Sequence, residues 1–134
     1  MDSARIVLDT DVASLSYKAR LPDPLARRLI GHELAVTFVT VAELARWAEK
    51  RQWGQRSRGE LAQWLARRVV LPYDDQVAWR WGQLSVAAEL RGRPRPINDM
   101  WIAACCLVAD LPLATLNLKD FSDFAEHEGL QLIT

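Results

Sequence analysis

The chain has 134 residues and a mass of 15.2 kDa; half of its residues are apolar, and 17 lysines and arginines balance 17 acidic residues. A chain of this length can bury a core, and we expect one domain that spans residues 1–134. The apolar and charged fractions are typical of a folded globular protein and exclude a disordered chain. A formal net charge of zero excludes a protein that is basic overall, although it is compatible with a local basic surface.

The sequence carries no pattern for membrane insertion or export. Its apolar runs are shorter than the roughly 18 residues that a membrane-spanning helix needs, and residues 1–12 lack the layout of a signal peptide. Cys105 and Cys106 are adjacent, so they cannot form a disulfide framework, and they lack the spacing of a metal site. We therefore expect a small cytoplasmic protein with no membrane partner.

The first half of the chain alternates between strand and helix patterns. The β-branched apolar run at 5–9 predicts a buried strand, and Thr10-Asp11 is suited to cap the helix that follows at 12–17. Thr40 and Glu43 form a capping-box pattern at the start of another helix. The other predicted elements are a helix at 25–30, a strand at 32–38, a helix at 41–51, a polar loop at 52–59 and a helix at 60–68.

The second half continues the same alternation. The predicted elements are a strand at 69–71, a long helix from Asp74 or Asp75 to 90, an Arg-Pro loop at 91–96, a helix at 98–108, and strands at 113–115 and 130–133. No repeat or linker divides the chain. The pattern predicts the α/β class: one domain with a mainly parallel central sheet of about five short strands flanked by helices.

Acidic and amide side chains follow several of the predicted strands. Asp9 ends the first strand, Glu43 and Asp99 lie in first turns of helices, and Asn117 and Asp120 follow the strand at 113–115. Active sites of open α/β sheets form beyond the carboxyl ends of their strands, so we expect these side chains at one edge. Oxygen ligands without histidine or thiol favour Mg²⁺ or Mn²⁺, which promote phosphodiester hydrolysis.

Two of these acids also have a purely structural explanation. An acid in the first turn of a helix favours the helix dipole without any function, which covers Glu43 and Asp99 taken singly. Asp9 differs because an acid at the end of a buried strand costs desolvation energy unless something compensates it. Spacing alone therefore suggests a metal-dependent hydrolase without deciding for it.

Four short segments contain these residues: LDTDV at 8–12, TVAEL at 40–44, NDMWIAA at 98–104 and TLNLKDF at 115–121. In order, interval and chain length they resemble the four motifs of the PIN domain, and in particular those of VapC-type toxins from bacterial toxin–antitoxin pairs. The resemblance covers essentially the whole chain. It implies a metal-dependent endoribonuclease, with RNA as the substrate.

The resemblance also implies roles for individual residues. Asp9 and Asp99 correspond to ligands of Mg²⁺ or Mn²⁺, and Glu43 binds the ion directly or through water. The fourth catalytic position falls on Asn117, where many relatives carry aspartate, and Asp120 is the other residue suited to it. A metal-bound water would then attack an RNA phosphate.

Several residues are candidates for holding RNA. Arg91, Arg93 and Arg95 form a basic loop just before Asp99, and the plain alternative for this loop is a solvated surface. The other candidates are Arg46, on the helix of Glu43, and the hydroxyl groups of Thr10 and Thr115.

The resemblance further implies a cognate VapB-like antitoxin and a homodimer. Three tryptophans, Trp47, Trp53 and Trp64, mark a surface that could receive an apolar antitoxin segment, with core packing as the alternative. Three others, Trp79, Trp81 and Trp101, are expected to pack in the core.

Two rival functions stay open from the sequence. One is a PIN nuclease that works in RNA processing without an antitoxin. The other is a catalytically defective PIN-like module that only binds RNA or protein. Asn117 favours this second rival, whereas the joint presence of Asp9, Glu43 and Asp99 opposes it.

Overall fold

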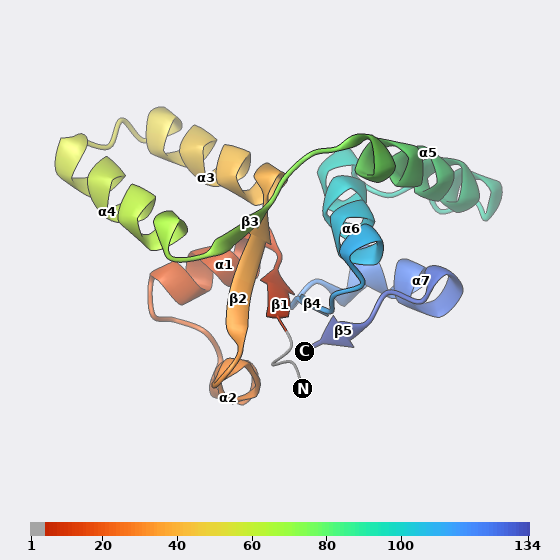
Figure 1. Ribbon diagram of the computed structural model, residues 1–134, viewed down its shortest axis with the longest axis horizontal. Coiled ribbons are helices and arrows are strands. Elements are labelled where there is room, and N and C mark those ends of the chain that lie inside the picture. The colour runs from red at the N-terminus through yellow and green to blue at the C-terminus, as the bar shows by residue number, and fades with distance from the viewer. Residues whose placement is uncertain (1–4) are drawn as a thin grey trace.

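The computed structural model describes residues 5–134, which form one sheet of five parallel strands flanked by helices (Figure 1). The strands, in the order β3-β2-β1-β4-β5 across the sheet, are numbered along the chain as β1 (Arg5–Leu8), β2 (Glu33–Thr37), β3 (Val69–Leu71), β4 (Leu113–Ala114) and β5 (Leu132–Ile133). The helices are α1 (Thr10–Tyr17), α2 (Asp23–Leu29), α3 (Phe38–Lys50), α4 (Gln55–Ala66), α5 (Asp75–Leu90), α6 (Ile97–Ala109) and α7 (Leu118–Glu128). This architecture confirms the predicted fold class.

Strand β1 is the centre of the sheet and separates two apolar cores. It pairs in parallel with β2 on one side and with β4 on the other. Ile6 and Leu8 pack with α1 and α2, whereas Val7 faces the opposite core with α5, α6 and α7. Because both faces of β1 are covered, its sequence is apolar without alternation, as is typical of a parallel sheet.

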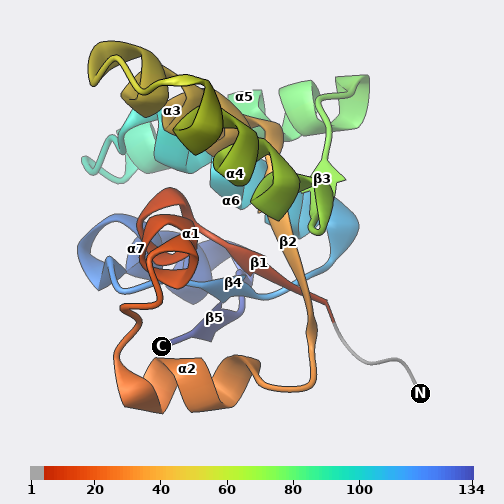
Figure 2. The ribbon, with the colours of Figure 1, turned by 90° about the vertical axis from the view of Figure 1, so that its left-hand side faces the viewer.

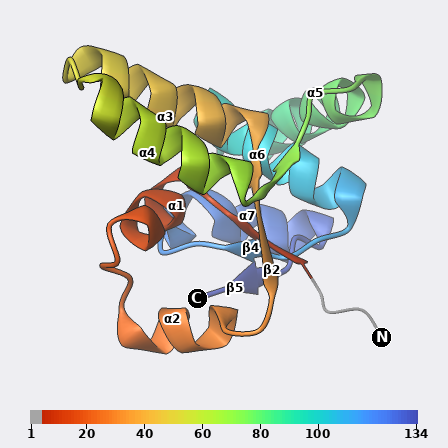
Figure 3. The same cartoon turned by 60° about the vertical axis from the view of Figure 1, so that its left-hand side comes forward.

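Helices α3 and α4 lie side by side as an arm on one side of the molecule, and α5 projects on the other side (Figures 1 and 3). A groove between α3 and α4 is lined by Val41, Ala48, Leu61 and Leu65. Figure 2 shows α2 at the end of the molecule remote from this arm. Within residues 5–134, none of the helices is both long and apolar enough to cross a membrane.

Two predicted helix starts are wrong. Asp9, not Thr10-Asp11, caps α1, because its carboxylate accepts from the Val12 amide. Helix α3 begins at Phe38 directly after β2, and Thr37 caps it by accepting from the Thr40 amide. The capping box of Thr40 and Glu43 is therefore absent, which leaves the Glu43 side chain free to take part in the site.

Three other predictions are corrected. Helix α4 starts at Gln55, inside the segment expected to be a loop, because Arg58 in its first turn donates to the carbonyl oxygen of Trp53. Helix α7 was not predicted. Most of its residues are polar, and its buried apolar side chains are Phe121 and Phe124. Trp79 is 77% exposed on α5 rather than packed in the core.

Candidate active site

An acidic pocket of about 250 Å³ lies beyond the carboxyl ends of β1 and β4. It is lined by residues from the starts of α1 and α6, the first part of α3 and the segment after β4, namely Asp9, Thr10, Asp11, Glu43, Asp99 and Asn117. The sequence motifs thus converge as expected for an open α/β sheet.

Asp9 is the most buried acid of the pocket, at 4% exposure. One carboxylate oxygen accepts from the Val12 amide at 2.8 Å, and the other accepts from the Thr115 hydroxyl at 2.5 Å. Burial raises the pKa of Asp9 to about 6, and nearby carboxylates add to the rise, although these two hydrogen bonds oppose it. Thr115 therefore orients the carboxylate and favours its charged form.

Glu43 is held from two sides. The Thr10 hydroxyl donates to one carboxylate oxygen at 2.5 Å, and the Asn98 amide donates to the other at 3.3 Å. Thr10 and Thr40 also share a hydrogen bond of 2.9 Å, which ties α1 to α3 beside the pocket. The two donors orient the glutamate toward the other acids.

Asp99 lies in the first turn of α6, half-buried among the other carboxylates. Burial raises the pKa of Asp99 to about 7, and the neighbouring carboxylates, Asp120 first, add to the rise. Because ionised carboxylates repel one another, it costs free energy to ionise Asp99 and its neighbours together when no cation is bound.

Asn117 and Asp120, the two alternatives for the fourth position, are in direct contact. The Asn117 side-chain amide donates to Asp120 at 2.8 Å, and its backbone amide donates to the Thr115 hydroxyl at 2.9 Å. Asn117 lines the acidic pocket, and Asp120 stands behind it, close enough to raise the pKa of Asp99. The two residues therefore form one hydrogen-bonded pair beside the pocket.

The chemistry of this pocket suits a divalent cation. Its donors are carboxylate and amide oxygens, which Mg²⁺ and Mn²⁺ prefer, and burial, with the nearby carboxylates adding to it, raises the pKa of Asp9 and of Asp99. Within the described part of the chain, no three acidic side chains already form a closed ligand set. Two of them are instead held by protein donors, Asp9 by Thr115 and Glu43 by Thr10.

The geometry of the acidic pocket agrees with the similarity of the whole chain to known proteins. Residues 6–127 match the PIN domain. The chain belongs to the PIN domain family. Ribonuclease VapC5 of Mycobacterium tuberculosis is 34% identical over 125 residues, which cover 92% of this chain and 87% of that protein. Ribonuclease VapC2 of Haemophilus influenzae is 29% identical over 118 residues, which cover 87% of this chain and 89% of that protein. In the DNA-bound VapBC structure from Salmonella typhimurium, one chain is 25% identical, with a TM-score of 0.82 and 97% coverage of both chains.

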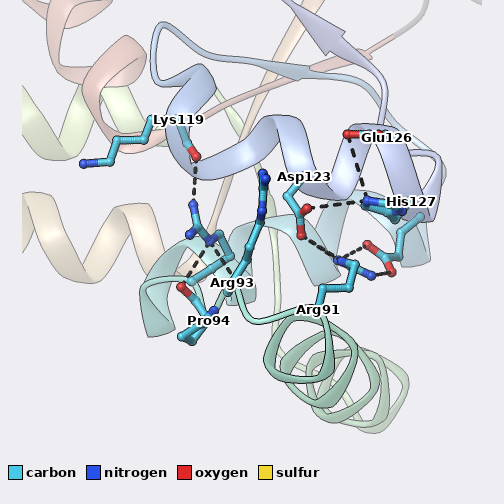
Figure 4. A network of polar contacts seen from close by, with 9 residues as sticks. Arg91, Arg93, Pro94, Lys119, Asp123, Glu126 and His127 are labelled. Carbon is cyan, nitrogen blue, oxygen red and sulfur yellow. Dashed lines mark hydrogen bonds and ion pairs between the residues drawn. The ribbon is translucent and has the colours of Figure 1, made fainter.

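Arg91, which we expected in a basic loop that holds RNA, is instead part of an ion-pair cluster in this PIN domain. Its guanidinium pairs with Asp123 at 2.7 Å and with Glu128 at 2.8 Å, and His127 flanks Asp123 (Figure 4). Asp123 is 4% exposed, so the cluster is a structural clamp between the loop after α5 and α7. The sequence offered no sign of this pairing because α7 itself was not predicted.

Two other basic residues, Arg95 and Arg46, lie close to acids of the site. Arg95 donates to the Lys119 carbonyl oxygen at 2.8 Å, and its guanidinium lies 3.8 Å from the Asp120 carboxylate. Arg93 is exposed on the same loop. Arg46 lines a second pocket, which shares Glu43 with the acidic pocket.

Sequence reasoning missed the rest of that second pocket in the PIN domain. Phe38, Asn98 and Trp101 line it, although we expected Trp101 only as a core residue. Asn98 stands directly before Asp99 in the third motif, which is the one signal that could have pointed to it.

Proposed function

We propose that this PIN domain is a metal-dependent endoribonuclease, the toxin of a VapBC-like pair, which hydrolyses RNA phosphodiester bonds and is inhibited by its cognate antitoxin. The observation that carries the proposal is that Asp9, Glu43 and Asp99 line one pocket, in which burial, with the nearby carboxylates adding to it, raises the pKa of Asp9 and of Asp99. The relatives named as VapC ribonucleases support the same chemistry.

In this proposal Asp9, Asp99 and Glu43 hold Mg²⁺ or Mn²⁺. A bound ion of this kind lowers the pKa of its water and neutralises charge on the phosphate. The Thr115 hydroxyl keeps the Asp9 carboxylate oriented, and Thr10 does the same for Glu43. Neutralisation of the crowded carboxylates stabilises their ionised forms, which are the forms that can serve as ligands.

The proposed phosphate contacts come from the basic residues that border the acidic pocket. Arg95 lies beside Asp120, and Arg46 lies beside Glu43, so both stand where an RNA backbone would enter. Arg93 is exposed next to Arg95 and could extend this track. Arg91 is excluded from the proposal because two carboxylates, those of Asp123 and Glu128, already neutralise its charge. Contacts of this type supply affinity without sequence choice.

The proposed site for a VapB-like antitoxin is the groove between α3 and α4. Its apolar lining, including Ala48, Leu61 and Leu65, suits the apolar face of a short helix. The similar Salmonella typhimurium structure is a VapBC complex, which supports a protein partner of this kind. A groove on α3 would place the antitoxin on the same helix as Glu43.

The proposed homodimer would form through α5. Trp79 and Leu90 are 77% and 82% exposed near the two ends of this helix. If two copies of α5 pack antiparallel, Trp79 of one copy meets Leu90 of the other. The exposed apolar face of α5 is therefore suited to pair with a second copy of itself, as a twofold interface requires.

The rival binding module without catalysis is favoured only by Asn117. An RNA-processing nuclease without an antitoxin uses the same pocket, so a neighbouring gene for a small DNA-binding protein would separate it from the toxin.

The decisive test is cleavage of total RNA by the purified protein with Mg²⁺ or Mn²⁺, and with EDTA. We expect metal-dependent cleavage that is lost in Asp9→Ala and kept in the control Asp75→Ala, whose carboxylate is exposed at the start of α5. Cleavage by Asp9→Ala at the wild-type rate would refute the assignment of the site. The absence of cleavage under every metal condition would favour the binding module.

A further inference from the structure

A second pocket of about 270 Å³ lies beside the acidic pocket. We call it the aromatic pocket, and its main lining residues are Phe38, Ala42, Glu43, Arg46, Asn98 and Trp101. Glu43 lines both pockets, so a group bound in one lies next to a group bound in the other. The proposed function uses the acidic pocket and leaves the aromatic pocket without a role.

The aromatic walls are held in place by their neighbours. Phe38 and Trp101 meet edge to face, with ring centroids 5.9 Å apart, and Trp81 stacks on Trp101 at 5.3 Å. Tyr73 meets both Phe38 and Trp101 edge to face. Four rings thus brace one another, so the wall is formed before any ligand binds.

The polar members of the aromatic pocket are a guanidinium and an amide. Arg46 is exposed on α3, one turn after Glu43, and a guanidinium can stack on a planar ring or pair with a phosphate. Asn98 offers both a donor and an acceptor, and its amide already reaches Glu43 at 3.3 Å. Aromatic faces, a guanidinium and an amide are the groups that proteins use to hold unpaired bases.

We propose that the aromatic pocket binds one unpaired nucleobase of the RNA substrate, next to the phosphate that is cleaved in the acidic pocket. This inference rests on the proposed function and adds to it a substrate class, RNA with an unstacked nucleotide at the cleavage site. The base stacks against the Phe38 and Trp101 wall, and the Asn98 amide contacts its edge. A base in a duplex cannot enter, because its faces and edges are already occupied.

The size and position of the pocket favour a base over other ligands. A volume of about 270 Å³ is below the usual range for drug-sized ligands and suits a single planar ring system. Arg46 at its border attracts the phosphate attached to such a ring. An apolar peptide side chain would make no use of the charge of Arg46.

Ala42→Met tests the proposal without disturbing the braced rings. Ala42 is exposed on α3 and lines the pocket, so a methionine there fills space that the base would take and costs little stability. The matched control is Ala66→Met, at an exposed position at the end of α4. The probes are single-stranded ten-residue RNA oligonucleotides and an abasic chain of the same length, measured by fluorescence anisotropy in EDTA.

We expect the wild-type protein and Ala66→Met to bind the RNA oligonucleotides about tenfold or more tightly than the abasic chain, because base stacking is lost in the latter. Ala42→Met should bind the abasic chain as the wild type does but lose most of the preference for bases. Equal binding of both probes by the wild type, or an unchanged preference in Ala42→Met, would overturn the proposal. Because this assay needs no cleavage, its failure is separate from a failure of the nuclease proposal.

Discussion

The substitution Asp9→Asn should make the protein inactive and more stable at neutral pH. The amide oxygen can still accept from Val12, and the amide nitrogen can donate to the Thr115 hydroxyl, which has a lone pair to receive it. The substitution therefore removes a buried charge while it keeps the cap of α1. Loss of cleavage in a more stable variant could not be ascribed to unfolding.

The magnitude follows from the pKa of the carboxyl group. The pKa of Asp9 is about 6 in the folded protein, against the ordinary value of 3.8, and at 1.36 kcal/mol per pKa unit this corresponds to about 3 kcal/mol of destabilisation above pH 6. Because the folded-state pKa is the higher one, folding is favoured at low pH and the cost develops as the pH rises from about 4 to 6. Weaker hydrogen bonds to the amide reduce the expected gain to about 2 kcal/mol, or about 6 °C in Tm.

The assay is thermal denaturation followed by circular dichroism in EDTA, at intervals between pH 4 and pH 7.5. We expect the two proteins to differ little at pH 4 and Asp9→Asn to have the higher Tm at pH 7.5. Asp75→Asn, which removes an exposed carboxylate, should change neither value. A variant that is less stable than the wild type at pH 7.5, or a difference that does not depend on pH, would refute the reasoning.

Three further predictions follow from other parts of the molecule. Asp99→Asn should abolish RNA cleavage and leave the circular dichroism spectrum unchanged, since it removes one charge and little volume; wild-type cleavage by this variant would contradict the site. Arg91→Ala should lower the free energy of unfolding in urea by about 3 kcal/mol, because it leaves the buried Asp123 carboxylate unpaired, whereas Arg93→Ala should have little effect. Trp79→Glu should convert a dimer to a monomer in sedimentation experiments, and an unchanged mass would remove α5 from the interface.

Much of the fold and the acidic part of the site could be predicted from the sequence. The β-branched apolar run that ends in Asp9 indicates a buried strand, and the topology of parallel sheets brings later acids such as Asp99 to the same edge. Helix α7 escaped prediction because its apolar side is narrow and its buried Asp123 is stabilised by an arginine from a distant loop. Patterns within a short stretch of sequence cannot reveal an ion pair, such as that of Arg91 and Asp123, between residues far apart in the chain.

The aromatic pocket was unpredictable for a related reason. Phe38 begins α3 and Trp101 lies in α6, and each alone is explained by core packing. Only the packing of α3 against α6 turns the two rings into one wall beside Glu43. The start of α3 was also misplaced, because the capping-box pattern at Thr40 competed with the cap that Thr37 provides.

The clamp at Arg91 has a mechanical consequence for the acidic pocket. It fastens the loop that leads into α6 to the far end of α7, so Asp99 and Asp120 belong to a single braced unit. Asp9 and Glu43 belong to another unit, joined by the threonine contacts between α1 and α3. The pocket thus lies between two groups of elements, which are linked across it by the hydrogen bonds of Thr115 to Asp9 and of Asn98 to Glu43. A substitution far from the pocket that breaks the Arg91 clamp would therefore change the spacing of the carboxylates, although none of the acids is itself replaced.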